Sequence, residues 1–166
     1  AGSNEMVEEF LRRGAEVNMA SAATSETALL AAARQDEHGT CQLLLSRSAL
    51  ADYQHRDGST ALLISVQGQY LQTAQVLLTG QANPLLGLPN SRTSFIEACA
   101  TGNEELVQLF IDVSTLLDHP HSIEQVSALM EVSFVGHLNI VNQLLGAGAA
   151  ADATDQNSKT PLFYAS

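Results

Sequence analysis

The sequence has few aromatic and few basic residues. Among 166 residues there is no Trp, aromatic side chains make up 5%, and one Lys, Lys159, joins six Arg. Because Asp and Glu number 18 against seven Lys and Arg, the formal net charge is −11. This charge argues against a DNA, RNA or anionic membrane partner and favours a neutral or basic one. With so few rings, the core has to be built from Leu, Ala and Val.

Cysteine and long apolar runs are also scarce. Cys41 and Cys99 lie far apart in apolar stretches, unlike the dense Cys framework of a secreted disulfide scaffold. We therefore expect an intracellular location, cytoplasmic or nuclear, with both thiols buried, reduced and unreactive. No apolar run approaches the roughly 20 residues of a membrane helix, so we expect no membrane insertion. Ala1-Gly2-Ser3 is typical of a cloning scar.

A period of 33 or 34 residues runs through the chain. Similar tripeptides start in phase at Thr27, Thr60, Thr93, Ser127 and Thr160. A second apolar patch follows about 17 residues later in each period, and it includes Leu77 and Leu144. Polar or Gly-containing breaks between the two patches suit a tight turn. The repeating unit is therefore predicted to be helix, turn, helix and loop, with Leu77 and Leu144 in the buried seam between repeats.

These features resemble ankyrin repeats, in the period, the Thr-Pro-Leu opener at 160–162 and the Gly-His turn at 136–137. The resemblance implies an all-α solenoid of stacked antiparallel helix pairs with short β-turn fingers. It also implies a protein-binding scaffold and not an enzyme, with no cofactor and no metal. A single array is expected over residues 4–166, with partial repeats at 4–20 and 154–166 and whole repeats at about 21–53, 54–86, 87–120 and 121–153. Because both outer repeats are partial, we expect the array to continue on both sides.

The sequence departs from the family pattern at several positions. The slot after Thr-Pro-Leu, which usually holds His, is apolar throughout and holds Leu30, Leu63, Ile96, Met130 and Phe163. We therefore expect apolar packing there in place of a polar network. Ser48 and Gln81 replace the usual Gly at the exit of the second helix. The single extra residue of the longer period is expected in an irregular loop at 118–122, because Pro is tolerated in loops.

No motif of the sequence indicates catalysis. His119 and His121, with Glu124 nearby, could ligate zinc, but a merely polar loop explains them better because no Cys or further His lies close in sequence. His137 is expected to have a structural role at its turn. The glycines at 146–149 close an amphipathic helix instead of opening one, so they indicate a helix C-cap and not a dinucleotide-binding loop.

The resemblance also implies where a partner binds. In ankyrin arrays the fingers and the outward face of the first helix line a concave groove. Counting four residues from each Thr or Ser places Ile64, Glu97, Glu131 and Tyr164 on that face. Nearby groove and fingertip positions hold Glu26, Arg56, Asp57, Tyr70, Asn103 and Phe134. Acidic and aromatic side chains together suit Arg or Lys of a partner, since Arg pairs with carboxylates and stacks on rings. The alternative is an ordinary solvated face of an acidic protein.

The predicted function is a scaffold that binds a peptide or a domain carrying basic residues in this acidic groove. Glu97 and Glu131 are the expected charged anchors, and Tyr70 and Phe134 the expected apolar ones. Two alternatives remain open, a structural spacer and a regulatory or substrate-recruiting arm of a larger enzyme or channel. Asn18 lies in a Gly-Ala-x-Val-Asn context that resembles the asparagine hydroxylated in some ankyrin proteins, which makes it a possible modification site.

Overall fold

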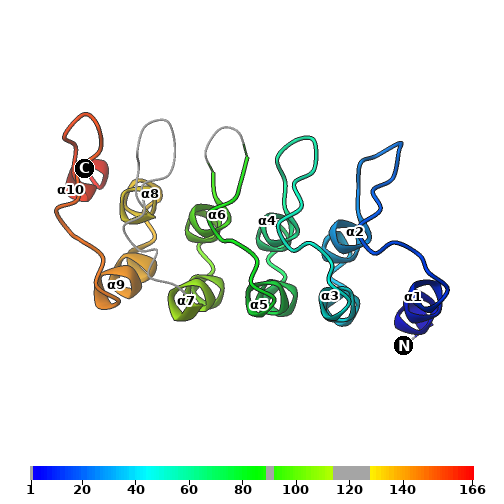
Figure 1. Ribbon diagram of the computed structural model, residues 1–166. Helices are drawn as coiled ribbons and strands as arrows, with labels where there is room; N and C mark the ends of the chain where they lie inside the picture. Colours follow the sequence, from blue (N-terminus) through cyan, green and yellow to red (C-terminus); the bar gives the residue numbers. More distant parts are fainter. Residues whose placement is uncertain (1, 89–91, 114–127) are drawn as a thin grey trace. The chain divides into compact units, whose positions relative to one another are not determined.

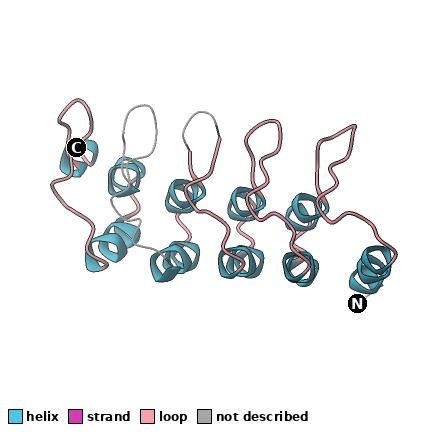
Figure 2. Ribbon diagram, in the orientation of Figure 1, coloured by secondary structure: helices cyan, strands magenta, loops and turns pink. Residues whose placement is uncertain are grey.

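The described part of the chain consists of short helices joined by turns and projecting loops. The computed structural model describes residues 2–88, 92–113 and 128–166. Over these residues there is no strand, and the one β-type pairing is an isolated antiparallel bridge between Gly87 and Thr93 (Figure 2). The chain divides into two compact units, Ala1–Asn83 and Pro84–Ser166.

The first unit arranges its helices in two layers. They are α1 (Gly2–Arg12), α2 (Ala28–Arg34), α3 (His38–Ser46), α4 (Ala61–Gln67) and α5 (Leu71–Thr79). In one layer α2 contacts α4, and in the other α3 contacts both α1 and α5 (Figure 1). The loops before α2 and α4 project from the same side, and we call them the first finger, residues 19–27, and the second finger, residues 51–60.

The second unit repeats this arrangement. It holds α6 (Ser94–Thr101), α7 (Glu104–Val113), α8 (Ala128–Val135), α9 (Leu138–Gly146) and α10 (Pro161–Tyr164). In one layer α8 contacts both α6 and α10, and in the other α7 contacts α9. Within each unit, helix pairs therefore stack in two layers, which confirms the predicted all-α solenoid of antiparallel helix pairs.

The recurring Thr marks the start of the first helix in each repeat. The hydroxyl of Thr60 accepts a hydrogen bond from the backbone N–H of Leu63, three residues later, at 3.1 Å. Thr27, Thr93 and Thr160 make the same bond. Each Thr has extended backbone angles and so acts as an N-cap, satisfying a donor that has no partner within the helix.

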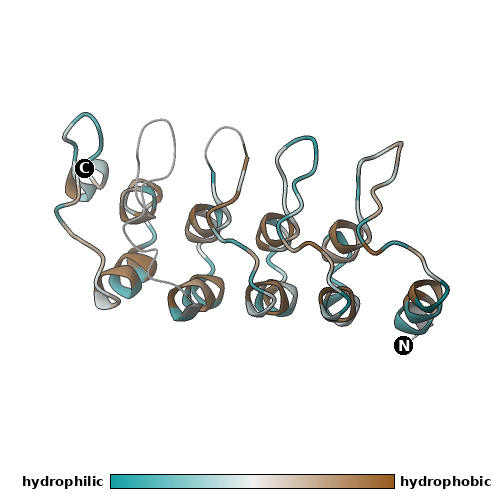
Figure 3. Ribbon diagram, viewed as in Figure 1, coloured by the Kyte–Doolittle hydropathy of each residue, from teal (hydrophilic) through white to brown (hydrophobic). Residues whose placement is uncertain are grey.

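The helices bury the apolar residues that the repeat pattern predicts. At the position that usually holds His in ankyrin repeats, Leu63 is fully buried, and Leu30, Ile96 and Met130 are each 1% exposed. This confirms apolar packing there, whereas Phe163 on α10 is 54% exposed. Leu77 and Leu144 are both fully buried, as predicted for the seam. Figure 3 shows the same pattern, with brown, hydrophobic segments where the helices face one another.

The turn between α8 and α9 packs against the turn of the preceding repeat. A ring nitrogen of His137 lies 3.2 Å from the carbonyl oxygen of Ala100, which confirms the structural role expected of this His. Gly102 has a φ of +76°, and a Cβ there would lie 2.8 Å from the His137 ring. Both the backbone conformation and the close approach of the ring therefore favour glycine at position 102, although Asp36 and Gln69 adopt a similar φ at the same turn of earlier repeats.

Candidate interaction surface

Arg92 joins the two carboxylates that the repeat pattern places on one face. Its Nη1 lies 3.0 Å from Oε2 of Glu97 on α6, and its Nη2 lies 2.5 Å from Oε1 of Glu131 on α8. The side chains are partly buried, with exposed fractions of 42% for Arg92, 18% for Glu97 and 16% for Glu131. We call these three residues the Glu–Arg–Glu cluster, and its formal charge is negative.

The finger before α6 positions Arg92. The N–H of Leu88 donates to the carbonyl of Arg92 at 3.2 Å, and the N–H of Ser94 donates to the carbonyl of Leu86 at 3.2 Å. Gly87 permits this pairing, because a Cβ at that position would overlap the Arg92 carbonyl group. The backbone pairing therefore holds Arg92 at the base of the finger, directly before the cap of α6.

Sequence reasoning missed Arg92 although it found both of its partners. The signal was a cation one residue before the cap Thr93 and five residues before Glu97. Residues at this spacing do not face each other as i,i+4 pairs on a helix do, so a search for helical ion pairs does not detect the contact. Only the backbone pairing of residues 86–88 with residues 92–94 brings Arg92 to carboxylates on two different helices.

The two predicted apolar anchors belong to different units and differ in exposure. Phe134, the seventh residue of α8, is 71% exposed and lies one helical turn beyond Glu131, on the same face. Tyr70 of the first unit is partly buried at the start of α5, and its ring covers Gly68. Ile64, also predicted for the groove, is only 6% exposed and so offers a partner little surface.

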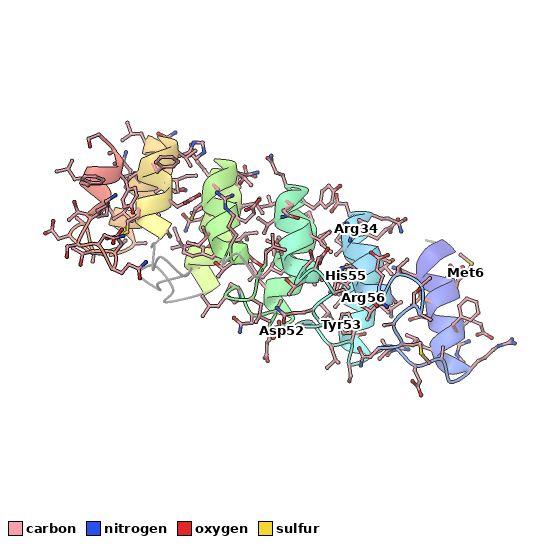
Figure 4. The ribbon with its side chains drawn as sticks, turned by 90° about the horizontal axis from the view of Figure 1, so that it is seen from above. Met6, Arg34, Asp52, Tyr53, His55 and Arg56 are labelled. Carbon is pink, nitrogen blue, oxygen red and sulfur yellow. The ribbon has the colours of Figure 1, made fainter. Side chains whose placement is uncertain are left out.

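The second finger is tied to the first finger by side-chain contacts. A ring nitrogen of His55, Nε2, lies 2.8 Å from the carbonyl oxygen of Thr24, and the Tyr53 hydroxyl donates to the carbonyl of Ser25 at 3.1 Å (Figure 4). The other ring nitrogen of His55 lies 2.9 Å from Oδ1 of Asp57, as an ion-pair contact without hydrogen-bond geometry. Arg56 is exposed beside them. The fingertip residues therefore hold the two fingers together as well as facing solvent.

These contacts shift the pKa values of His55 and Asp57 in opposite directions. The Asp57 carboxylate, and then the Thr24 carbonyl, raise the pKa of His55. Hydrogen bonds from Ser59, backbone first, lower the pKa of Asp57 to about 2. Both shifts favour the charged forms, so the pair is an ion pair when His55 is protonated.

Most of the other predicted surface residues have structural partners. Oε1 of Glu26 lies 2.9 Å from Nε of Arg34, and the Asn103 side chain accepts bonds from the backbone N–H groups of Glu105 and Leu106 at the start of α7. The Tyr164 hydroxyl donates to Oδ2 of Asp155 at 2.8 Å. These residues lie near the surface, but some of their polar atoms already form hydrogen bonds or ion pairs within the chain.

Asn18 has a structural role in the first unit. Its amide Nδ2 donates to the carbonyl of Ser48 at 3.2 Å, and its Oδ1 accepts from the N–H of Leu50 at 2.8 Å. Asp52, the same position one repeat later, accepts from the N–H of Asn83 at 2.7 Å. This position therefore links consecutive inter-repeat loops. Modification of Asn18 stays a prediction.

The cysteines are buried and free. Burial, aided by the Asp36 and Glu37 carboxylates, raises the pKa of Cys41 to about 12. Burial also raises the pKa of Cys99, and the charge of Glu131 adds to the rise. A thiol with such a pKa is a poor nucleophile at neutral pH, in agreement with the expected lack of reactivity.

The described residues contain no group of three His, Cys, Asp or Glu side chains placed to hold a metal ion. The possible zinc ligands His119, His121 and Glu124, and the irregular loop expected at 118–122, lie outside the described residues. Within the same described part, every helix is too short or too polar to cross a membrane.

Comparison with known proteins identifies the repeats. The family model for ankyrin repeats in three copies matches residues 1–87. The chain is 30% identical over 112 residues, 67% of its length, to ankyrin repeat and KH domain-containing protein mask-1 of Caenorhabditis elegans. It is 27% identical over 161 residues, 96% of its length, to neurogenic locus notch homolog protein 1 of Homo sapiens. The matched regions span 4% of the first protein and 6% of the second. Ankyrin repeats are in general non-catalytic modules of protein–protein interaction.

Proposed function

Because the chain belongs to the ankyrin-repeat family, we propose that it is a scaffold whose second unit binds a partner segment bearing Arg or Lys. The observation that carries the proposal is the convergence of Glu97 and Glu131 on one guanidinium group, from the same slot of consecutive first helices. Two carboxylates facing one cation keep a negative charge at this point, to which a partner's cation is attracted.

The distribution of charge along the chain supports a basic partner at this unit. Residues 84–166 contain nine acidic residues and two basic ones, Arg92 and Lys159, which gives a net charge of −7 out of −11 for the whole chain. A carboxylate can accept about four hydrogen bonds, so the contact with Arg92 leaves Glu97 and Glu131 able to accept more. The excess negative charge also speeds the encounter with a basic segment.

A structural spacer is the second candidate. The apolar slots of Leu63, Ile96 and Met130 strengthen the stack without adding a binding group, which is what a spacer needs. The chain matches only small parts of long relatives, so an arm of a larger enzyme or channel is a third candidate. Binding by the chain itself separates the first candidate from the spacer.

The test measures the affinity of the whole chain for a fluorescent 12-residue peptide that contains four Arg residues. Fluorescence anisotropy reports the binding. Glu97→Gln with Glu131→Gln removes two charges without changing side-chain shape. Each partly exposed ion pair is worth up to about 1 kcal/mol, so the loss of both carboxylates should lower the affinity by about tenfold and weaken its salt dependence.

The matched control is Glu5→Gln with Glu16→Gln, which removes the same charge from exposed positions of the first unit. This control should bind as wild type does. Equal losses in both double variants would mean that only net charge matters, and no binding by wild type would favour the spacer. Thermal melts of each variant show whether it is folded.

A further inference from the structure

We propose that Phe134, Val135 and Leu138 form a docking surface for bulky apolar side chains of the same basic segment, an inference that rests on the proposed function. The partner is then an amphipathic segment that combines Arg or Lys with residues such as Leu. The three side chains end α8 and begin α9, and their exposed fractions are 71%, 42% and 69%. We call them the turn patch.

The turn patch is not explained by stacking of repeats. In the first unit the same three positions hold Arg34, Gln35 and His38, and all three are exposed although the next repeat, with α4 and α5, packs alongside. In the first unit, a following repeat therefore leaves these positions exposed, and in the second unit Ala100 and Thr101 at two of them are half-buried and not part of the core. Three bulky apolar residues at sites that stay in water cost solubility without stabilising the stack.

Other repeats avoid this combination. The corresponding residues are Gln67, Gly68 and Leu71 in one repeat and Ala100, Thr101 and Glu104 in the next. Within the sequence, three apolar residues of this size coincide at these positions only between α8 and α9. The difference is local to one turn, as expected of a binding feature and not of a general packing rule.

Carboxylates border the turn patch and identify the chemistry of its occupant. Glu131 lies one helical turn before Phe134 on α8 and belongs to the Glu–Arg–Glu cluster. On the other side, Oε1 of Glu104 accepts a hydrogen bond from the Asn139 side chain at 2.6 Å, next to Leu138. An apolar surface between two carboxylates fits Leu or Phe flanked by basic residues better than a purely apolar or an acidic segment.

The experiment compares two fluorescent 12-residue peptides with the whole chain, one alternating Arg and Leu and one alternating Arg and Ser. Burial of even one Leu favours binding enough that we expect the Arg/Leu peptide to bind at least about tenfold tighter. The variant Phe134→Gln, Val135→Gln, Leu138→Gln should lose this gain and bind both peptides alike. Gln occurs at position 67 of the chain, so the same helix position tolerates it.

A triple variant with three other exposed apolar residues replaced, Met19→Gln, Leu50→Gln and Leu162→Gln, is the matched control and should keep the gain. The inference is overturned if the Arg/Leu peptide gains nothing, or if the turn-patch variant keeps the gain. It is also overturned if sedimentation shows that the turn patch joins two copies of the chain. If instead Glu97→Gln with Glu131→Gln leaves the affinity for the Arg/Ser peptide unchanged, the proposed function fails while the turn patch can still hold.

Discussion

Arg92 determines how much negative charge the Glu–Arg–Glu cluster presents. It contacts one oxygen of Glu97 and one of Glu131, and so occupies part of the space a partner's cation would use. Arg92→Gln should therefore increase affinity for the four-Arg peptide by about twofold to tenfold, because a competing charge is removed at a partly exposed site.

The same anisotropy titration checks this prediction, with Arg56→Gln as the control. Arg56 is exposed on the second finger in the other unit, so its replacement changes the net charge equally. If Arg92→Gln weakens binding while Arg56→Gln does not, Arg92 serves to position the two carboxylates instead of competing with the partner.

Ser48 and Gln81 adopt a backbone conformation that favours glycine. Their φ values are 65° and 66°, and Gly14 and Gly148 at the corresponding exits have 92° and 97°. Because side chains with a Cβ are strained in this region, Ser48→Gly or Gln81→Gly should each stabilise the fold by about 0.5–1 kcal/mol. Urea melts measure the change.

Gln35 provides the matched control for these glycine substitutions. It ends α2 with a φ of −97°, an ordinary value, so Gln35→Gly should leave stability unchanged or lower it. Equal effects at positions 35, 48 and 81 would show that the left-handed conformation is not the cause.

At the scale of elements, α5 and α9 are held by the Leu residues of the seam. Leu77 and Leu144 are fully buried, so truncation of either to Ala should cost about 2–5 kcal/mol. Gln75→Ala, at an exposed position of α5, should change stability by less than about 0.5 kcal/mol. Urea melts in which Leu77→Ala and Gln75→Ala behave alike would contradict the packing described for α5.

The second finger should depend on pH through His55 and Asp57. The pKa of His55 is raised in the folded chain. Its contribution to stability is therefore full below the unfolded pKa of about 6.5 and is lost as pH rises through the folded pKa. The pKa of Asp57 is lowered to about 2, so its contribution to stability is full above its unfolded value of 3.8 and is lost as pH falls toward and through the folded value of about 2. Both contributions coexist between about pH 4 and 6.5.

His55→Gln should therefore destabilise the chain more at pH 5 than at pH 8, as measured by thermal melts. His38→Gln, at the exposed start of α3, is the control and should show a smaller difference between the two pH values. A His55→Gln effect that is equal at both pH values would mean that the ion pair with Asp57 contributes nothing.

For the whole molecule, the repeat period predicted most of the fold, because each Thr cap and each buried Leu recurs at a fixed spacing. The same spacing placed Glu97 and Glu131 on one face, and Arg92 joins them. The spacing could not predict that Arg92 contacts both carboxylates, because the position of Arg92 depends on the backbone pairing at the base of a finger. Nor could it predict that Ile64 is buried, because exposure depends on neighbouring side chains. The extent of the array over residues 4–166 stays a prediction.

The most direct measurement of the central claim is an NMR titration of the ¹⁵N-labelled whole chain with the four-Arg peptide. If the second unit binds a basic segment through its acidic cluster, the largest amide shifts will fall on Arg92, Glu97 and Glu131 and on their neighbours in α6 and α8. These shifts will diminish in Glu97→Gln with Glu131→Gln. Shifts that are confined to residues 2–83, or that lie only on α7 and α9, would contradict the claim.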